Sequence, residues 1–346
     1  MSVRIFLMVT HDEFLVPFLT KALSSDNYKV FSLAGDASNR RYYRVVQDNQ
    51  SWVLMRWEPY DPNNYPFLSV LNHFAKNGVH VPTVVAQSPQ EGLMLLEDLG
   101  DLTLERKFWE SQSQEASLEF YQMAVDEIVK IHHPATLDKS DCTAFKIEFN
   151  TEKFLWEMNY GKDNLLSGVL KFPFGESLNK EITDIFVDIS SRLDKEPKRI
   201  AHRDYHSRNL MIKLDQMSVI DFQDARLGPI QYDLVSLMRD SYVDMNDSMA
   251  RTLIDYYLER SKAYLPKDFS REQFDRIYEL QSIQRCFKAC GSFASFYHLR
   301  QDRRYLKYLS GTLRRVMKAI NEFPEYKVFA DVLIDSGALE RKYESL

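Results

Sequence analysis

The first hundred residues are dominated by short runs of apolar residues separated by polar turns. Runs of β-branched and aromatic residues bounded by turn-forming residues are typical of strands. A period near 3.6 predicts a short helix over Asp12–Ala22 and another over Phe67–Lys76, where Asn77-Gly78 is a stop signal. Strands are expected over Tyr28–Leu33, Tyr42–Gln47, Ser51–Trp57, Thr83–Gln87 and Leu93–Glu97. The pattern predicts a small antiparallel sheet with one inserted helix.

Beyond Gly100 apolar residues recur every three to four positions, as in amphipathic helices. We expect one β-hairpin, over residues 210–220, to be the only interruption. The helices are expected over Gln114–His133, Thr151–Asn159, Leu178–Leu193 and most of the chain from Tyr232 onward. A β-rich lobe followed by a helical one predicts an α+β, bilobal fold, with a nucleotide-binding lobe over residues 1–98, a catalytic and substrate-binding lobe over residues 99–346, and a cleft between them.

Composition narrows the class of protein. Apolar residues make up 45% and charged residues 27% of the 346 positions, as in ordinary globular proteins. A net charge of −6 argues against general nucleic-acid binding. No apolar run approaches transmembrane length, and Ile5–Val9 is too short for a signal sequence, so we expect no membrane association and a cytoplasmic location. The three cysteines contain no C-x-x-C pair, and we expect reduced thiols, with Cys286 and Cys290 buried.

The candidate chemistry lies between Ile200 and Leu237. Asp204 follows His202-Arg203, Asn209 comes five residues later, and Asp221 follows an apolar strand. Two short strands, over 210–212 and 218–220, would form a hairpin that returns Asp221 to Asn209. H-R-D-x-x-x-x-N followed by D-F is the kinase arrangement of a base and metal-binding oxygens. We therefore expect Asp204 to be the base and Asn209 and Asp221 to hold Mg²⁺ beside ATP.

A zinc site is a weaker interpretation of the same segment. His202 and His206 are four residues apart, but no third ligand completes a set at the usual zinc spacing. A single H-x-D could also arise by chance in a loop. A chance origin is unconvincing here, because Asp204, Asn209 and Asp221 all fall at the required offsets around apolar strands.

Upstream residues supply candidates for nucleotide binding. The small-residue turn containing Gly35 and Ser38 could approach phosphates, although an ordinary hairpin loop is the alternative. Arg56, on the third expected strand, is either a phosphate contact or a solvated strand-end arginine. The segment containing Glu97 and Leu99 is expected to be a hinge whose backbone binds adenine. The helix over 67–76 contains no acidic residue, so the usual lysine–glutamate pair of kinases has no obvious counterpart.

These motifs resemble the aminoglycoside-phosphotransferase-like kinases, a superfamily with a protein-kinase-like fold. The chain is similar in particular to bacterial anomeric sugar kinases that act on N-acetylmuramate and N-acetylglucosamine in cell-wall recycling. The resemblance spans nearly the whole chain. It rests on Gly35–Ser38 with Arg40–Tyr42, Leu96–Asp101, His202–Asn209, Ile220–Ala225, Gly228-Pro229, Tyr232–Leu234, Gln284–Phe293 and Tyr305-Leu306. Phe222-Gln223-Asp224-Ala225 replaces the D-F-G continuation of protein kinases. Met55-Arg56-Trp57-Glu58-Pro59 departs from the family's usual M-D-A-P-P.

The resemblance also implies residues for the acceptor sugar. Glu157 matches a family glutamate near the sugar, with a helix-surface glutamate as the alternative. Asp224 would meet substrate hydroxyls or Arg203. Arg285 and Lys288, one turn apart, would hold an anionic group or support the catalytic loop. Asp233 is expected to bind backbone beneath that loop.

Three functions remain open on the sequence alone. The resemblance favours ATP-dependent phosphorylation of the anomeric hydroxyl of an N-acetylated amino sugar. A second possibility is phosphorylation of another hydroxylated small molecule, such as an aminoglycoside. A third is a pseudokinase that binds nucleotide without turnover, against which the intact Asp204, Asn209 and Asp221 weigh.

Overall fold

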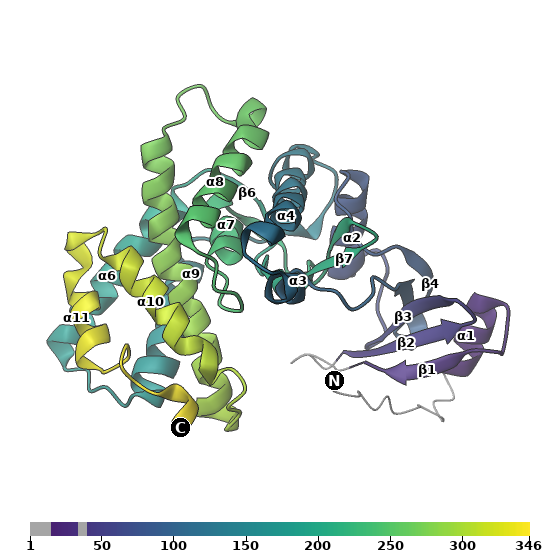
Figure 1. The fold of residues 1–346 in the computed structure, drawn as a ribbon, viewed down its shortest axis with the longest axis horizontal. Coiled ribbons are helices and arrows are strands. Elements are labelled where there is room, and N and C mark those ends of the chain that lie inside the picture. Colours follow the sequence, from purple (N-terminus) through teal and green to yellow (C-terminus); the bar gives the residue numbers. More distant parts are fainter. Residues whose placement is uncertain (1–14, 34–39) are drawn as a thin grey trace.

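The computed structural model describes residues 15–33 and 40–346. A small lobe built around a sheet is followed by a larger helical lobe, as Figure 1 shows. The α+β, bilobal expectation is therefore confirmed. Gly35 and Ser38, proposed above for phosphate binding, lie outside the described residues, as does the start of the helix expected from Asp12.

The small lobe contains an antiparallel sheet of order β1-β2-β3-β5-β4. Helix α2 ends where Asn77-Gly78 predicts, and Gly78 has a left-handed φ of +79°. The strands are β1 Lys29–Ser32, β2 Arg41–Gln47, β3 Gln50–Arg56, β4 Val84–Ser88 and β5 Leu93–Glu97, and the helices are α1 Leu15–Leu23 and α2 Pro66–Lys76. Every strand and helix predicted in residues 15–33 and 40–100 is present, and each end that lies within these residues coincides with the prediction or differs by one residue.

The two faces of this sheet belong to different apolar clusters. On the outer face, Tyr43, Leu54 and Leu95 pack against α1. On the inner face, Met55 and Leu96 join a second cluster that continues into the larger lobe. The alternation of neighbouring strand residues between faces explains this division. Only the outer-face cluster is confined to the small lobe.

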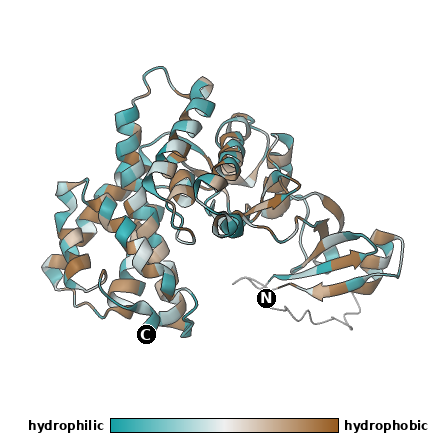
Figure 2. Cartoon of the chain, viewed as in Figure 1, coloured by the Kyte–Doolittle hydropathy of each residue, from teal (hydrophilic) through white to brown (hydrophobic). Residues whose placement is uncertain are grey.

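The larger lobe is mainly helical, and Figure 2 shows both polar and apolar segments on most of its helices, as expected where one side is buried. The long helix α9 runs through its centre and packs against α5, α7 and α10. The helices are α3 Leu104–Glu110, α4 Leu118–Lys130, α5 Thr151–Gly161, α6 Glu176–Asp194, α7 Ile230–Met238, α8 Asp247–Ser261, α9 Arg271–Arg300, α10 Leu309–Ile320 and α11 Lys327–Asp335. Two π-helical segments, Ile131–Ala135 and Lys162–Val169, extend α4 and α5.

Helices α5 and α9 approach closely at a pair of glycines. A Cβ atom added at Gly291 would lie 2.6 Å from the Cα atom of Gly161. That separation is far below van der Waals contact, so the crossing requires the absence of side chains. The crossing fixes α9 relative to α5, and α9 carries Arg285 and Lys288.

Strands interrupt the helical lobe at two places. β7 Leu210–Lys213 and β8 Gln216–Val219 form the predicted hairpin, with left-handed φ values at Leu214 and Asp215. The expectation that only this hairpin interrupts the helices is wrong, because β6 Lys198–Ala201 pairs with β9 Arg226–Pro229. These four-residue strands include charged residues and a proline, so they lack the apolar alternation that reveals a strand. No helix in the described part of the chain is long and apolar enough to cross a lipid bilayer.

Candidate active site

A buried carboxylate fixes the loop that carries Asp204. Asp233, on α7, accepts hydrogen bonds from the backbone amides of His202 at 2.6 Å and Arg203 at 2.9 Å. Its side chain is fully buried, and His132 Nε2 lies 3.3 Å from it. Arg203 adopts a φ of +83°, which a non-glycine residue rarely holds without support. The predicted backbone-binding role of Asp233 is confirmed.

The β7–β8 hairpin brings the other two predicted catalytic groups beside this loop. Asn209 Nδ2 donates to the backbone oxygen of Asp204 at 2.9 Å and lies 3.3 Å from Asp221 Oδ2. The amide of Ile220 donates to the Asn209 carbonyl at 3.0 Å, closing the hairpin beyond its strands. His202 Nε2 lies 3.0 Å from the Ile220 carbonyl. The structure thus brings Asp204, Asn209 and Asp221 together.

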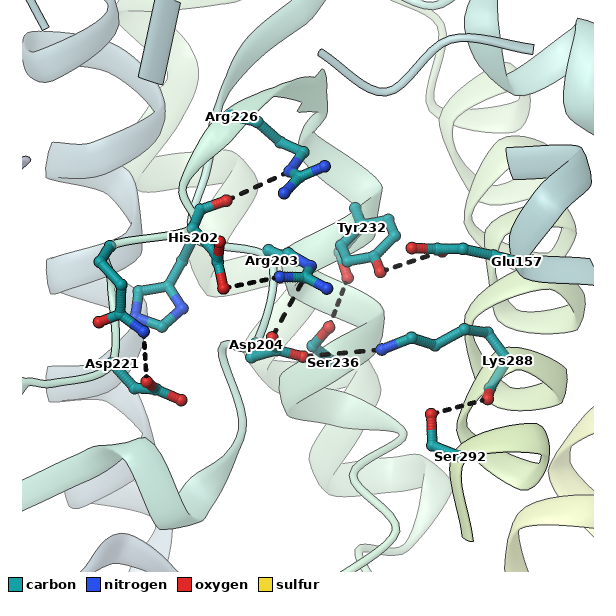
Figure 3. A network of polar contacts seen from close by, with 12 residues as sticks. Glu157, His202, Arg203, Asp204, Asp221, Arg226, Tyr232, Ser236, Lys288 and Ser292 are labelled. Atoms are coloured by element: carbon teal, nitrogen blue, oxygen red, sulfur yellow. Dashed lines mark hydrogen bonds and ion pairs between the residues drawn. The ribbon is translucent and has the colours of Figure 1, made fainter. Parts of the chain in front are cut away.

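Three cations face the Asp204 carboxylate, as Figure 3 shows in part. Arg285 Nη2 lies 3.4 Å from Oδ1, Lys288 Nζ lies 3.9 Å from the same oxygen, and Arg203 Nε lies 3.9 Å from Oδ2. Burial raises the pKa of Asp204, but the positive charges of Lys288, Arg285 and Arg203 outweigh it, so the pKa lies well below its ordinary value. Asp204 is therefore ionised at neutral pH.

A cavity of about 920 Å³ lies between the lobes, and we call it the inter-lobe cavity. Its lining includes Glu97 and Leu99, which are predicted hinge residues, together with Asn209 and Asp221. The backbone amide of Leu99 donates no hydrogen bond to any described residue. Its position and this free donor suit the edge of a planar heterocycle.

An ion-pair network holds the hinge against β2. Arg44 Nε lies 2.7 Å from Asp98 Oδ2, and Arg44 Nη1 lies 3.0 Å from Asp101 Oδ2. The side chain of Asp98 also accepts a hydrogen bond from the Gly100 amide at 2.9 Å. Arg44 lines the cavity, but its Nη1 and Nη2 atoms donate hydrogen bonds to these two carboxylates. The network joins the sheet to the hinge, and the sequence analysis missed it.

The structure does not bring Arg56 to the inter-lobe cavity. Its neighbours Met55 and Trp57 pack on the inner face of the sheet, so strand alternation puts Arg56 on the outer face with Leu54. Arg40 lines the cavity instead, with its guanidinium 5.5 Å from the Trp57 ring centre. The alternation of residues 40, 42 and 44, all of which line the cavity, is the sequence signal that could have identified it.

Among the residues predicted for the acceptor, Glu157 lies beneath the site. Its side chain is fully buried and accepts a hydrogen bond from Gln284 Nε2 at 2.9 Å, with the Tyr232 hydroxyl 3.4 Å away. The Glu157 carboxylate supports α9 and α7, while its Oε1 has no hydrogen-bond partner among the described residues, and its contact with the sugar stays a prediction. Asp224 is half exposed and pairs with Arg203 at 2.9 Å, which was one of its two predicted partners.

A second cavity of about 200 Å³ adjoins Asp204, and we call it the acceptor-side cavity. Arg285 lines it and donates to the Ser236 hydroxyl at 3.1 Å while facing Asp204. The full lining is Asp204, His206, Val235, Ser236, Arg239, Asp240, Ser241, Tyr242, Arg285, Cys286, Lys288, Ala289, Ser292 and Phe293. Asp204 lines this cavity along α9, whereas Asn209 and Asp221 line the inter-lobe cavity.

Comparison with known proteins agrees with this geometry. Residues 30–269 match the model of the phosphotransferase enzyme family. The N-acetylmuramate/N-acetylglucosamine kinase of Pseudomonas aeruginosa is 30% identical over 304 residues, which cover 87% of this chain and 86% of that protein. The kinase of the same name from Neisseria meningitidis is 30% identical over 312 residues, covering 87% and 90%.

Solved structures share the fold at low sequence identity. The ADP-bound aminoglycoside phosphotransferase APH(2'')-Ib is 16% identical, with a TM-score of 0.57 and coverage of 95% of this chain and 99% of that one. A choline kinase from Cryptosporidium parvum is 11% identical, with a TM-score of 0.59 and coverage of 94% and 97%.

Proposed function

Because the chain belongs to the phosphotransferase enzyme family, we propose that it transfers the γ-phosphoryl group of ATP to the anomeric hydroxyl of N-acetylglucosamine or N-acetylmuramate. The observation that carries the proposal is the convergence of Asp204, which lines the acceptor-side cavity, with Asn209 and Asp221, which line the inter-lobe cavity. The names of the relatives that match most of the chain support the sugar. The use of ATP is consistent with a cytoplasmic reaction.

The inter-lobe cavity suits ATP in shape and chemistry. Adenine would lie at the hinge, with the Leu99 amide as donor, and Arg40 would meet the phosphates. The Asp221 carboxylate and the Asn209 amide oxygen are hard oxygen donors, and two such protein ligands are typical of a Mg²⁺ site completed by phosphates and water. Bound Mg²⁺ would neutralise charge on the transferred phosphoryl group.

The low pKa of Asp204 bears on the choice of acceptor hydroxyl. A carboxylate held ionised by three cations is a weak base, so it orients an attacking hydroxyl more than it removes the proton early. The hemiacetal hydroxyl at C1 is more acidic than the other sugar hydroxyls and loses its proton most easily. In a loose phosphoryl-transfer transition state such an acceptor needs less help from the base than a less acidic hydroxyl would. This argument favours C1 over C6.

The experiment is an ADP-release assay over a panel of acceptors. We expect turnover with N-acetylglucosamine or N-acetylmuramate and none with their methyl glycosides, in which O1 is blocked. The product should be acid-labile and show phosphorus coupling to the anomeric proton in NMR. Coupling to the C6 protons would refute the anomeric assignment. Turnover of aminoglycosides alone would establish a different acceptor, and nucleotide binding without turnover would indicate a pseudokinase.

A further inference from the structure

The acceptor-side cavity has one polar and one apolar group of lining residues. His206, Lys288 and Ser292 supply polar atoms near Asp204. The apolar contribution comes from Val235, Cys286, Ala289 and Phe293. Figure 3 shows Lys288 extending from α9 toward Asp204, on the side away from Asp221. A ligand group placed here would be beside the catalytic carboxylate and away from the metal-binding residues.

Three residues of this lining, Lys288, His206 and Arg239, each have a nitrogen atom without a hydrogen bond to a described residue. Lys288 Nζ makes no hydrogen bond to any described residue, and its contact with Asp204 is an ion pair at 3.9 Å. His206 Nδ1 is buried and likewise has no hydrogen-bond partner within residues 15–33 and 40–346. Arg285, by contrast, is tied to Ser236. The Lys288 side chain is 13% exposed, so a ligand oxygen in the cavity can reach its ammonium group and supply the missing hydrogen bond.

The chemistry of the proposed substrate identifies that oxygen, and this step rests on the proposed function. If O1 lies against Asp204, the substituent nearest to it is the acetamido group on C2, because C2 is bonded to C1. The lactyl carboxylate of N-acetylmuramate is attached through C3 and lies farther away. A carbonyl oxygen beside an ammonium and a methyl group beside apolar side chains also match both halves of the lining.

We propose that the acceptor-side cavity binds the acetamido group of the sugar, with its carbonyl oxygen accepting a hydrogen bond from Lys288 and its methyl group packed against Val235, Ala289 and Phe293. Lys288 and Ala289 are then specificity-determining residues that separate N-acetylated sugars from glucose. The burial of Lys288, which lowers the pKa of its ammonium group, is consistent with a site that a ligand oxygen completes.

The test uses two ligands that lack the anomeric hydroxyl, 1,5-anhydroglucitol and its 2-acetamido-2-deoxy analogue. Their dissociation constants are measured by calorimetry with the full chain, ADP and Mg²⁺. Wild type should prefer the acetamido ligand, and Lys288→Met should reduce this preference about tenfold or more, since a hydrogen bond from a charged donor is lost. Lys288→Arg should retain part of the preference. Lys180→Met, at an exposed position of α6, is the control and should match wild type.

Equal weakening of both ligands by Lys288→Met would mean that Lys288 acts only through Asp204, and would overturn the proposal. So would a loss confined to nucleotide affinity, which would make Lys288 a phosphate contact. Ala289→Leu provides an independent check, because added volume in the cavity should weaken only the acetamido ligand. Ala289→Val replaces it if the leucine variant loses its circular dichroism signal.

The binding test and the test of function fail separately. Neither ligand can be phosphorylated at C1, so the preference for the acetamido group does not depend on turnover. If the preference follows Lys288 but the phosphate goes to another hydroxyl, the cavity assignment stands and the anomeric proposal falls. If C1 is phosphorylated but substitutions of Lys288 and Ala289 leave the preference unchanged, the anomeric proposal stands and the cavity assignment falls.

Discussion

Replacing Asp233 by asparagine tests whether this residue holds the catalytic loop. In the native loop its two oxygens accept the His202 and Arg203 amides at 2.6 and 2.9 Å. Asparagine keeps one acceptor oxygen and directs an NH₂ group at the other amide. One buried hydrogen bond to a charged acceptor is lost and one N–H is left unsatisfied, which together cost about 3 kcal/mol. That is a large part of the 5–15 kcal/mol of a typical domain.

The same change should impair catalysis out of proportion to its effect on folding. Arg203 holds a left-handed φ of +83°, a conformation that costs on the order of 1–3 kcal/mol and persists only where its surroundings enforce it. Once the Asp233 bonds weaken, the loop can relax and displace Asp204. A displacement of about 1 Å can reduce kcat by about 100-fold.

Two measurements check this prediction, urea unfolding followed by circular dichroism and steady-state kcat with ATP and sugar. Asp244→Asn is the matched control, because that side chain is 94% exposed and should leave both values unchanged. An unfolding free energy of Asp233→Asn within about 0.5 kcal/mol of wild type would refute the reasoning, since surface substitutions alone give changes of that size.

The remaining predictions concern catalysis, nucleotide binding and packing. Asp204→Asn should lower kcat by about 10²–10⁴-fold in a coupled ADP assay. Because the folded-state pKa of Asp204 is lowered, its contribution to stability is present above the ordinary aspartate pKa of about 3.9 and is lost at lower pH. The difference in unfolding free energy between wild type and Asp204→Asn should thus be constant from pH 5 to 8 and shrink below pH 4. A difference that varies between pH 5 and 8 would contradict the assignment. Arg40→Ala should weaken ATP binding much more than adenosine binding in calorimetry, whereas Arg56→Ala should affect neither; the opposite result would restore Arg56 as the phosphate contact. Gly291→Ala should destabilise the folded protein by about 1–3 kcal/mol or prevent folding. Gly311→Ala is the control, because an added Cβ there meets only the Arg314 side chain at 3.9 Å, and it should leave the melting temperature unchanged or slightly raised. Equal effects of the two substitutions would refute the close crossing of α5 and α9.

Much of the fold and the centre of the site could be predicted from sequence, because both depend on local patterns. Turn residues and β-branched runs predicted the small sheet, and the spacing of Asp204, Asn209 and Asp221 predicted a hairpin that joins them. The role of Asp233 followed from the family resemblance and is confirmed by two backbone hydrogen bonds. The positions of the lobe boundary and the roles of the substrate residues stay predictions.

Spacing along the chain does not give the face of the sheet on which a side chain lies or the depth at which it is buried, and both matter for Arg56 and Glu157. Arg56 is on the expected strand, but a shift of one residue along a strand moves a side chain to the other face. Glu157 is on the expected helix, but its complete burial by α7 and α9 is a tertiary property. The β6–β9 pair joins segments more than twenty residues apart, and no local pattern records such a pairing.

The separation of the apolar clusters on the two faces of the sheet has a consequence for local opening. Helix α1 and the outer face can come apart without exposing the cluster that runs through both lobes, so backbone amides of α1 should exchange with solvent at a lower free energy than those of α2. Helix α2, whose Phe67 ring is tilted against the Phe222 ring with centres 5.1 Å apart, should instead be protected from exchange together with the catalytic segment. The unit that unfolds cooperatively then extends from the helical lobe into the small lobe, and the hinge does not divide it.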